Sequence, residues 1–130
     1  MNYNLSLTNC TSGYWEFVRL LRMHEAVQDG FIEKQHITPE QQIKYMSVYQ
    51  DCYRIALLDK EPVGYFGVID NDIRICVHPD HQSKGVGKFL VTSCRDIWPE
   101  GFAKIKFNNT PSKKLFESCG YKLKYHIYEA

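Results

Sequence analysis

Residues 77–90 constrain the fold of this chain more than any other segment. A short apolar run over residues 73–77 is followed by Pro79, and a polar loop then leads through Gln82-x-x-Gly85-x-Gly87 into a helical pattern of apolar residues. Two glycines between a strand and a helix let several backbone N–H groups converge, and the helix N-terminus adds partial positive charge. The segment therefore predicts an anion site of the kind that holds a phosphate or pyrophosphate.

Two common nucleotide-binding motifs do not fit this loop. A Walker A loop would need glycine where Gln82 stands and a hydroxyl residue where Phe89 stands. A dinucleotide fingerprint would need a third glycine at Leu90. The anion expected here is therefore not bound in either of these two ways.

The rest of the chain predicts one domain over residues 1–130, with helices and strands interleaved. Apolar periodicity and capping residues indicate helices over residues 11–26, 39–49, 86–97 and 111–118. Strand signals occupy residues 2–7, 53–58, 63–69, 73–77, 104–107 and 121–128. This order predicts an α/β (α+β) fold with a mixed, mostly antiparallel central sheet and helices on both faces.

Composition narrows the class of partner. The net charge is +1, so we expect neither a nucleic acid nor a membrane surface as partner. Five cysteines are scattered without a C-x-x-C pair, which favours reduced thiols in a cytoplasmic protein over a disulfide frame or a metal site.

The loop and a second segment together resemble the GCN5-related N-acetyltransferase (GNAT) family. The second segment is Asn109-x-x-Ser112-x-x-Leu115-Phe116, followed by Gly120-Tyr121. The resemblance implies the GNAT acyltransferase fold, acetyl coenzyme A (acetyl-CoA) as cofactor and a small-molecule or peptide amine as acceptor. It also implies that the loop amides bind the pyrophosphate, that the strand at residues 75–77 pairs with the pantetheine, and that Asn109 and Phe116 lie near that arm. The cofactor-binding residues are then Ile75, Cys76, Val77, Gln82, Ser83, Lys84, Gly85, Val86, Gly87, Lys88, Asn109 and Phe116.

Phe116 departs from the family pattern, in which a tyrosine at this position often protonates the leaving thiol. Water, or the hydroxyl of Tyr121 or Tyr125, is an alternative proton donor. His78 and Asp72 are candidates for the general base that an ammonium acceptor requires, alongside a chain of waters. A weakly catalytic or non-enzymatic acyl-CoA-binding module on the same fold is the alternative function.

The N-terminal helices are expected to cover the acceptor. Their sequence is similar to that of the subgroup that acetylates amino groups of nucleotide-linked sugars, which would give Arg19 or Arg22 a phosphate to bind. Solvated arginines on an outer helix face are an equally simple interpretation. A homodimer formed through the C-terminal strands is a further expectation from the resemblance.

Overall fold

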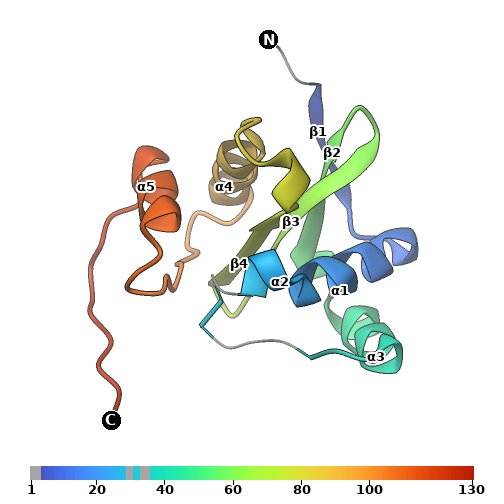
Figure 1. The fold of residues 1–130 in the computed structure, drawn as a ribbon, viewed down its shortest axis with the longest axis horizontal. Coiled ribbons are helices and arrows are strands. Elements are labelled where there is room, and N and C mark those ends of the chain that lie inside the picture. Colours follow the sequence, from blue (N-terminus) through green and yellow to red (C-terminus); the bar gives the residue numbers. More distant parts are fainter. Residues whose placement is uncertain (1–3, 29–30, 33–35) are drawn as a thin grey trace.

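The computed structural model describes residues 4–28, 31–32 and 36–130, and its centre is an antiparallel sheet of four strands. The strands are β1 (Leu5–Asn9), β2 (Tyr53–Leu58), β3 (Glu61–Ile69) and β4 (Asp72–Val77), and they neighbour one another in chain order (Figure 1). Tight turns join β2 to β3 and β3 to β4, with positive φ at Asp59, Lys60, Asp70 and Asn71. Each of these turns fixes the register of the strand that follows it.

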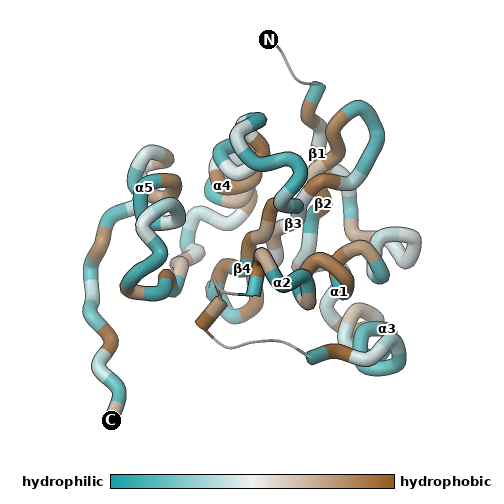
Figure 2. The backbone as a smooth tube through the Cα atoms, in the orientation of Figure 1, coloured by the Kyte–Doolittle hydropathy of each residue, from teal (hydrophilic) through white to brown (hydrophobic). Residues whose placement is uncertain are grey.

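Helices cover both faces of the sheet, as the sequence predicts. Helices α1 (Trp15–Met23), α2 (Glu25–Gln28) and α3 (Pro39–Tyr49) lie on one face, and α4 (Val86–Ile97) and α5 (Thr110–Ser118) lie on the other (Figure 1). Successive strand residues alternate between two apolar clusters: Phe66 and Val68 pack with α4, whereas Tyr65 packs with α1 and α3. Apolar residues concentrate along β3 and β4, and the loop before α4 is hydrophilic (Figure 2). None of the helices in the described ranges is long and apolar enough to cross a membrane.

The predicted elements are confirmed over the centre of the chain. Strand β2 and helix α3 have the predicted ends, and α3 begins with the predicted capping box between Thr38 and Gln41. The predicted helix over residues 11–26 is interrupted at His24, whose extended backbone separates α1 from α2. The first strand begins and ends later than predicted, at Leu5 and Asn9, and residues 2–3 of the prediction lie outside the described residues.

The two predicted C-terminal strands are absent from this structure. Residues 104–107 and 121–128 form no strand, although residues 121–128 alternate in hydropathy as a strand does. Residues 122–130 are exposed, and the tail leaves α5 away from the sheet (Figure 1). A strand needs backbone partners, and these segments find none in the described chain, so the local pattern alone does not form a ladder.

Gly67 is required for the packing of the face that carries α1 and α3. It lies between Tyr53 of β2 and Arg74 of β4 in the register, and a Cβ atom there would lie 2.5 Å from Cε1 of the buried Tyr53 ring. We therefore predict that Gly67→Ala lowers the free energy of unfolding by about 1–3 kcal/mol, as overpacking of a core does. Chemical denaturation measures the loss.

Gly13→Ala is the matched control, because no atom lies within 4 Å of a Cβ built at Gly13. Equal stability of Gly67→Ala and Gly13→Ala would contradict this account of the Tyr53 contact.

Candidate functional site

The outer edge of β4 presents backbone groups that the sheet leaves open. Ile73 N–H donates outward to the Phe102 carbonyl at 2.8 Å, whereas His78 N–H donates inward to Val63 at 2.8 Å. Because backbone direction alternates along a strand, Ile75 and Val77 also direct their N–H and C=O groups outward. Beyond the single parallel bridge between Asp72 and Phe102, no strand of the described chain covers this edge.

This geometry refines the prediction for residues 75–77. Ile75 and Val77 provide the open backbone groups, while Cys76 pairs with Tyr65 of β3 and is 6% exposed. Burial raises the pKa of the Cys76 thiol to about 12, with the charge of Arg22 acting in the opposite direction. Cys76 is therefore a neutral packing residue, and a nucleophilic thiolate is not available there.

The start of α4 has unpaired backbone donors in the described chain, at the place where the sequence predicts an anion site. Gly85 is its N-cap with φ of 80°, and Ser83 also has positive φ, at 66°. The first turns of α3 and α5 are capped by the side chains of Thr38 and Asn109, but α4 has no side-chain cap and no acidic residue in its first turn. The first N–H groups of a helix have no intrahelical partner, so those of α4 remain available to an anion.

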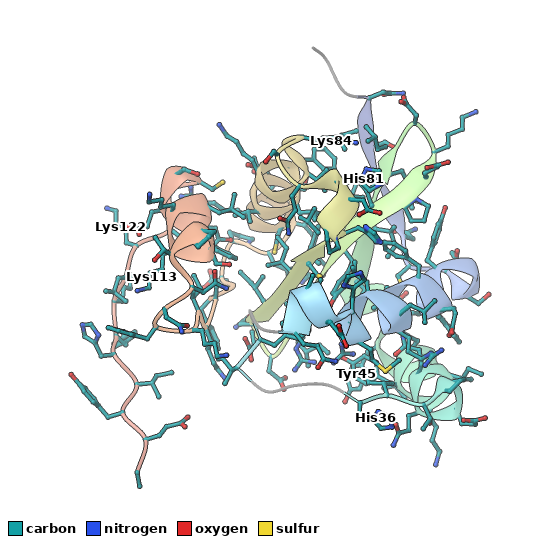
Figure 3. The ribbon with its side chains drawn as sticks, in the orientation of Figure 1. His36, Tyr45, His81, Lys84, Lys113 and Lys122 are labelled. Carbon is teal, nitrogen blue, oxygen red and sulfur yellow. The ribbon has the colours of Figure 1, made fainter. Side chains whose placement is uncertain are left out.

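Basic side chains flank this helix start. Lys84 Nζ lies 3.3 Å from His81 Nδ1, and the two side chains lie together before α4 (Figure 3). Lys88 is exposed in the first turn, and Gln82 and Ser83 are exposed in the loop. Val86 is buried, so it contributes its backbone and anchors the loop on the core. The site is open, cationic and lined by N–H donors, which suits a polyanion.

Gly87 lies in the first turn of α4 and faces α5, and Asn109 lies at the start of α5. A Cβ at Gly87 would lie 3.1 Å from Cδ2 of Leu115, so the glycine lets α4 and α5 pack closely. Asn109 Oδ1 accepts a hydrogen bond from Ser112 N–H at 3.3 Å, which makes Asn109 the N-cap of α5. The Asn109 side chain is therefore used as a helix cap in this structure.

Two of the predicted catalytic residues are engaged by neighbours. Asp72 lies 3.3 Å from Lys104 Nζ in an ion pair. His78 Nδ1 accepts the Asp80 N–H at 3.1 Å, so the neutral ring carries its proton on Nε2. His78 therefore presents a hydrogen-bond donor, and its ring lies beside those of His24 and His81, with centroid distances of 5.7 and 5.8 Å.

Phe116 and Tyr121 both pack in the core beside α4. Phe116 is 4% exposed, and its ring meets the Tyr121 ring edge-on at 5.2 Å. The Tyr121 hydroxyl is buried without a hydrogen-bond partner in the described chain. Burial raises the pKa of Tyr121 to about 12, followed by the influence of Cys94. Both rings belong to the apolar cluster on the α4 face of the sheet, which also includes Ile75 and Val77 of β4.

The two predicted acceptor-binding arginines differ in their surroundings. Arg19 pairs with Glu16 and donates to the Ile37 carbonyl at 3.1 Å, so it joins α1 to the segment before α3. Arg22 lines a concavity of about 310 Å³ between α1 and α3, with its Cζ atom 5.7 Å from the Tyr45 ring centroid. The geometry thus favours Arg22 over Arg19 as a ligand-binding residue.

Sequence reasoning missed three residues that meet beside this concavity. Tyr45 and Tyr53 have hydroxyl oxygens 2.7 Å apart, and Arg74 Nη1 donates to Tyr45 at 3.0 Å. The available signal was weak: Arg74 is the one charged residue between Ile73 and Val77. In the parts of the chain that the structure describes, no group of three or more His, Cys, Asp or Glu residues could hold a metal ion.

Comparisons with known proteins agree with this geometry. Residues 49–123, more than half of the chain, match the family profile described as "Acetyltransferase (GNAT) domain". No curated protein sequence matches the chain. Strands β2 to β4, the open edge of β4 and the uncapped start of α4 all lie within the matched residues, whereas β1 lies outside them. The chain belongs to the GNAT acetyltransferase family.

Solved structures share its fold. The spermidine N-acetyltransferase from Vibrio cholerae, in complex with CoA and spermine, has 17% identity and a TM-score of 0.82, over 97% of this chain and 85% of that chain. An aminoglycoside N-acetyltransferase in complex with CoA has 13% identity and a TM-score of 0.74, over 100% and 95%. An acetyltransferase (GNAT family) from Bacillus anthracis has 17% identity and a TM-score of 0.72, over 92% and 81%. These structures confirm the predicted fold class, and they give no support to the nucleotide-linked sugar subgroup.

Replacement of Asn109 tests how much its side chain stabilises the protein as the N-cap of α5. We predict that Asn109→Ala lowers the free energy of unfolding by about 1 kcal/mol, because Ser112 N–H loses its acceptor, and that Asn109→Asp retains full stability. Thermal or chemical denaturation of the three proteins measures the difference. Equal stability of the alanine and aspartate variants would show that the cap contributes nothing.

Removal of the Tyr121 hydroxyl tests its predicted catalytic role. Because this hydroxyl is buried without a partner in the described chain, we predict that Tyr121→Phe is as stable as the parent or up to about 1 kcal/mol more stable. We also expect acetyl transfer to be unchanged within about threefold, well below the usual effect of a general acid. A loss of more than tenfold in kcat would instead make Tyr121 a proton donor.

Proposed function

We propose that this protein is an N-acetyltransferase that moves the acetyl group of acetyl-CoA directly to an amine. The observation that carries the proposal is the continuity of two open sites, the free edge of β4 and the uncapped start of α4. The first suits a peptide-like chain with N–H and C=O groups, and the second suits a pyrophosphate. Acetyl-CoA, the cofactor of this family, has both groups in that order.

Each part of the site has a distinct task in this proposal. The N–H groups at the start of α4, with Lys84 and Lys88, hold the pyrophosphate. The outward backbone groups of Ile75 and Val77 align the pantetheine arm and the acyl group beside it. When acetyl-CoA is bound, it supplies a thioester carbonyl to which the amine nitrogen forms a bond as the C–S bond breaks.

Proton transfer in this proposal does not depend on one strong acid or base. His78 presents Nε2–H when neutral, so it is suited to donate a hydrogen bond to a developing anion and not to take a proton from the ammonium. The Asp72 carboxylate forms an ion pair with Lys104. We propose that water accepts the ammonium proton, and that the departing thiol, with an ordinary pKa of about 8.5, leaves without a dedicated acid.

A non-enzymatic acyl-CoA-binding module is the second candidate, favoured by the buried Phe116 ring at the family's tyrosine position. A screen of amines with thiol detection separates the two functions. Release of thiol above the uncatalysed rate with any amine supports the enzyme. Acetyl-CoA binding without turnover across the screen supports the module.

Gly85 provides the test of the cofactor site. We predict that Gly85→Glu reduces acetyl-CoA affinity at least about 100-fold, because a carboxylate is placed where the pyrophosphate binds and because φ of 80° disfavours a side chain. Isothermal titration calorimetry measures the affinity. Gly13→Glu is the control, since Gly13 is exposed with open space around it. Binding that Gly85→Glu leaves intact would overturn the assignment of the loop.

A further inference from the structure

The side chain of Arg74 lies on the acceptor side of the strand that is proposed to bind the cofactor. Ile73, Ile75 and Val77 pack against the cluster with α4, whereas Cys76 packs with α1 and α3. By the alternation of the strand, Arg74 shares the face of Cys76. Arg74 also directly precedes Ile75, whose backbone faces the open edge. A group bound by Arg74 would therefore lie beside the position proposed for acyl transfer.

The neighbouring strands hold Arg74 in place. Tyr53, Gly67 and Arg74 follow one another across β2, β3 and β4, and the absence of a side chain at Gly67 lets the Tyr53 ring lie over it. The Tyr53 hydroxyl meets that of Tyr45 at 2.7 Å, and Tyr45 accepts from Arg74 at 3.0 Å. The guanidinium is thus positioned by residues from two neighbouring strands, β2 and β3, and from helix α3.

The hydrogen-bond partners of Arg74 are neutral. Burial, and then the neighbouring Tyr53 hydroxyl, raise the pKa of Tyr45 above its ordinary value, so it stays protonated at neutral pH. Asp72 is the one carboxylate of β4, and it pairs with Lys104. Its charge also acts on the pKa of Arg74, but it comes after burial and the two tyrosines among the causes. In the described parts of the chain, none of the ion pairs includes Arg74. A half-buried guanidinium without a carboxylate partner retains donors and charge for an anion.

Tyr45 links this guanidinium to a space that a small molecule can enter. The concavity of about 310 Å³ between α1 and α3 is lined by Arg22, Ile37, Gln41, Gln42 and Tyr45. The Tyr45 hydroxyl extends from that lining to the sheet, where its oxygen accepts a hydrogen bond from Arg74 Nη1. Arg74 does not itself line the concavity, but an anionic group that extends past Tyr45 toward the sheet would meet its planar guanidinium. A guanidinium is suited to two parallel hydrogen bonds with a carboxylate or a phosphate.

We infer that the acceptor of this enzyme is a small amine that also carries an anionic group, a carboxylate or a phosphate, which Arg74 binds. The inference rests on the proposed function and names its substrate class. Spermidine and aminoglycosides, after which two enzymes of the same fold are named, are polycations, which a guanidinium at this position would repel.

The test compares amines that differ in their second group. The panel is 4-aminobutyrate, 2-aminoethyl phosphate, n-butylamine, ethanolamine, putrescine and spermidine, with kcat/KM measured by thiol release and the product checked by mass spectrometry. We expect kcat/KM for the amines that carry a carboxylate or a phosphate to exceed kcat/KM for the matched amines that lack an anionic group. The expected ratio is about 10- to 100-fold, the range of a charge-assisted hydrogen bond. The carboxylate and phosphate members show which anion is preferred. Preference for spermidine or for the uncharged amines would overturn the inference.

Variants of Arg74 assign the preference to this residue. Arg74→Gln should remove the preference for anionic amines by raising KM for these amines. Arg74→Lys should retain part of this preference. Tyr45→Phe, which removes the hydroxyl that holds the guanidinium, should raise KM several-fold with kcat unchanged. Lys44→Gln is the matched control, because it removes one positive charge at an exposed position of α3, the helix that carries Tyr45. A preference that survives in Arg74→Gln would overturn the assignment.

Failure of the inference is distinguishable from failure of the proposed function. Acetyl transfer to any amine, with acetyl-CoA binding that depends on Gly85, establishes the function even if the anionic amines show no advantage. If no amine is acetylated, calorimetric titration of 4-aminobutyrate and 2-aminoethyl phosphate decides the inference alone. Binding that Arg74→Gln abolishes supports it, and absence of binding overturns it.

Discussion

The structure depends on the unequal hydrogen bonding of the two edges of β4. The inner edge is paired with β3 along the whole strand, whereas among the described residues the outer edge is paired only where Phe102 meets Asn71 and Ile73. Open backbone groups at a sheet edge favour association with another extended chain. Here the open part is only a few residues long and ends at a helix start that attracts anions. This combination suits the proposed ligand, which is peptide-like at one end and polyanionic at the other.

Alternation along the same strand assigns the two substrates to different faces. The odd-numbered residues from Ile73 to Val77 pack toward α4 and leave their backbone at the open edge, while Arg74 and Cys76 point toward α1 and α3. One short strand therefore contributes to both proposed binding regions without a hinge or a second domain. The glycines support this division: Gly67 admits the Tyr53 ring on one face, and Gly87 admits Leu115 on the other.

Short sequence patterns predicted the elements whose conformation is determined by residues close together in the sequence. The capping box of α3, the turns around β3 and the glycine loop before α4 are each specified within a few residues, and each is present. Residues 121–128 have an equally clear strand pattern, but strand formation depends on a partner elsewhere in the chain. The outward direction of Ile75 and Val77 likewise depends on the hydrogen bonds of Ile73 and His78, which no sequence pattern reports. The contact between Arg74 and Tyr45 joins residues 29 apart in sequence, so it was beyond pattern reasoning.

The surroundings of the proposed acyl group favour catalysis by positioning over catalysis by proton transfer. Phe116 has no proton to give, Asp72 is neutralised by Lys104, and His78 presents a donor. A reaction between two bound groups still gains much of its rate when both are aligned before they react. An anionic handle on the acceptor, held by Arg74 beside the strand that aligns the thioester, would direct binding energy from a remote part of the substrate to that alignment. In this arrangement the guanidinium on β4 would determine the specificity for the acceptor, while the backbone of the same strand would align the acyl group.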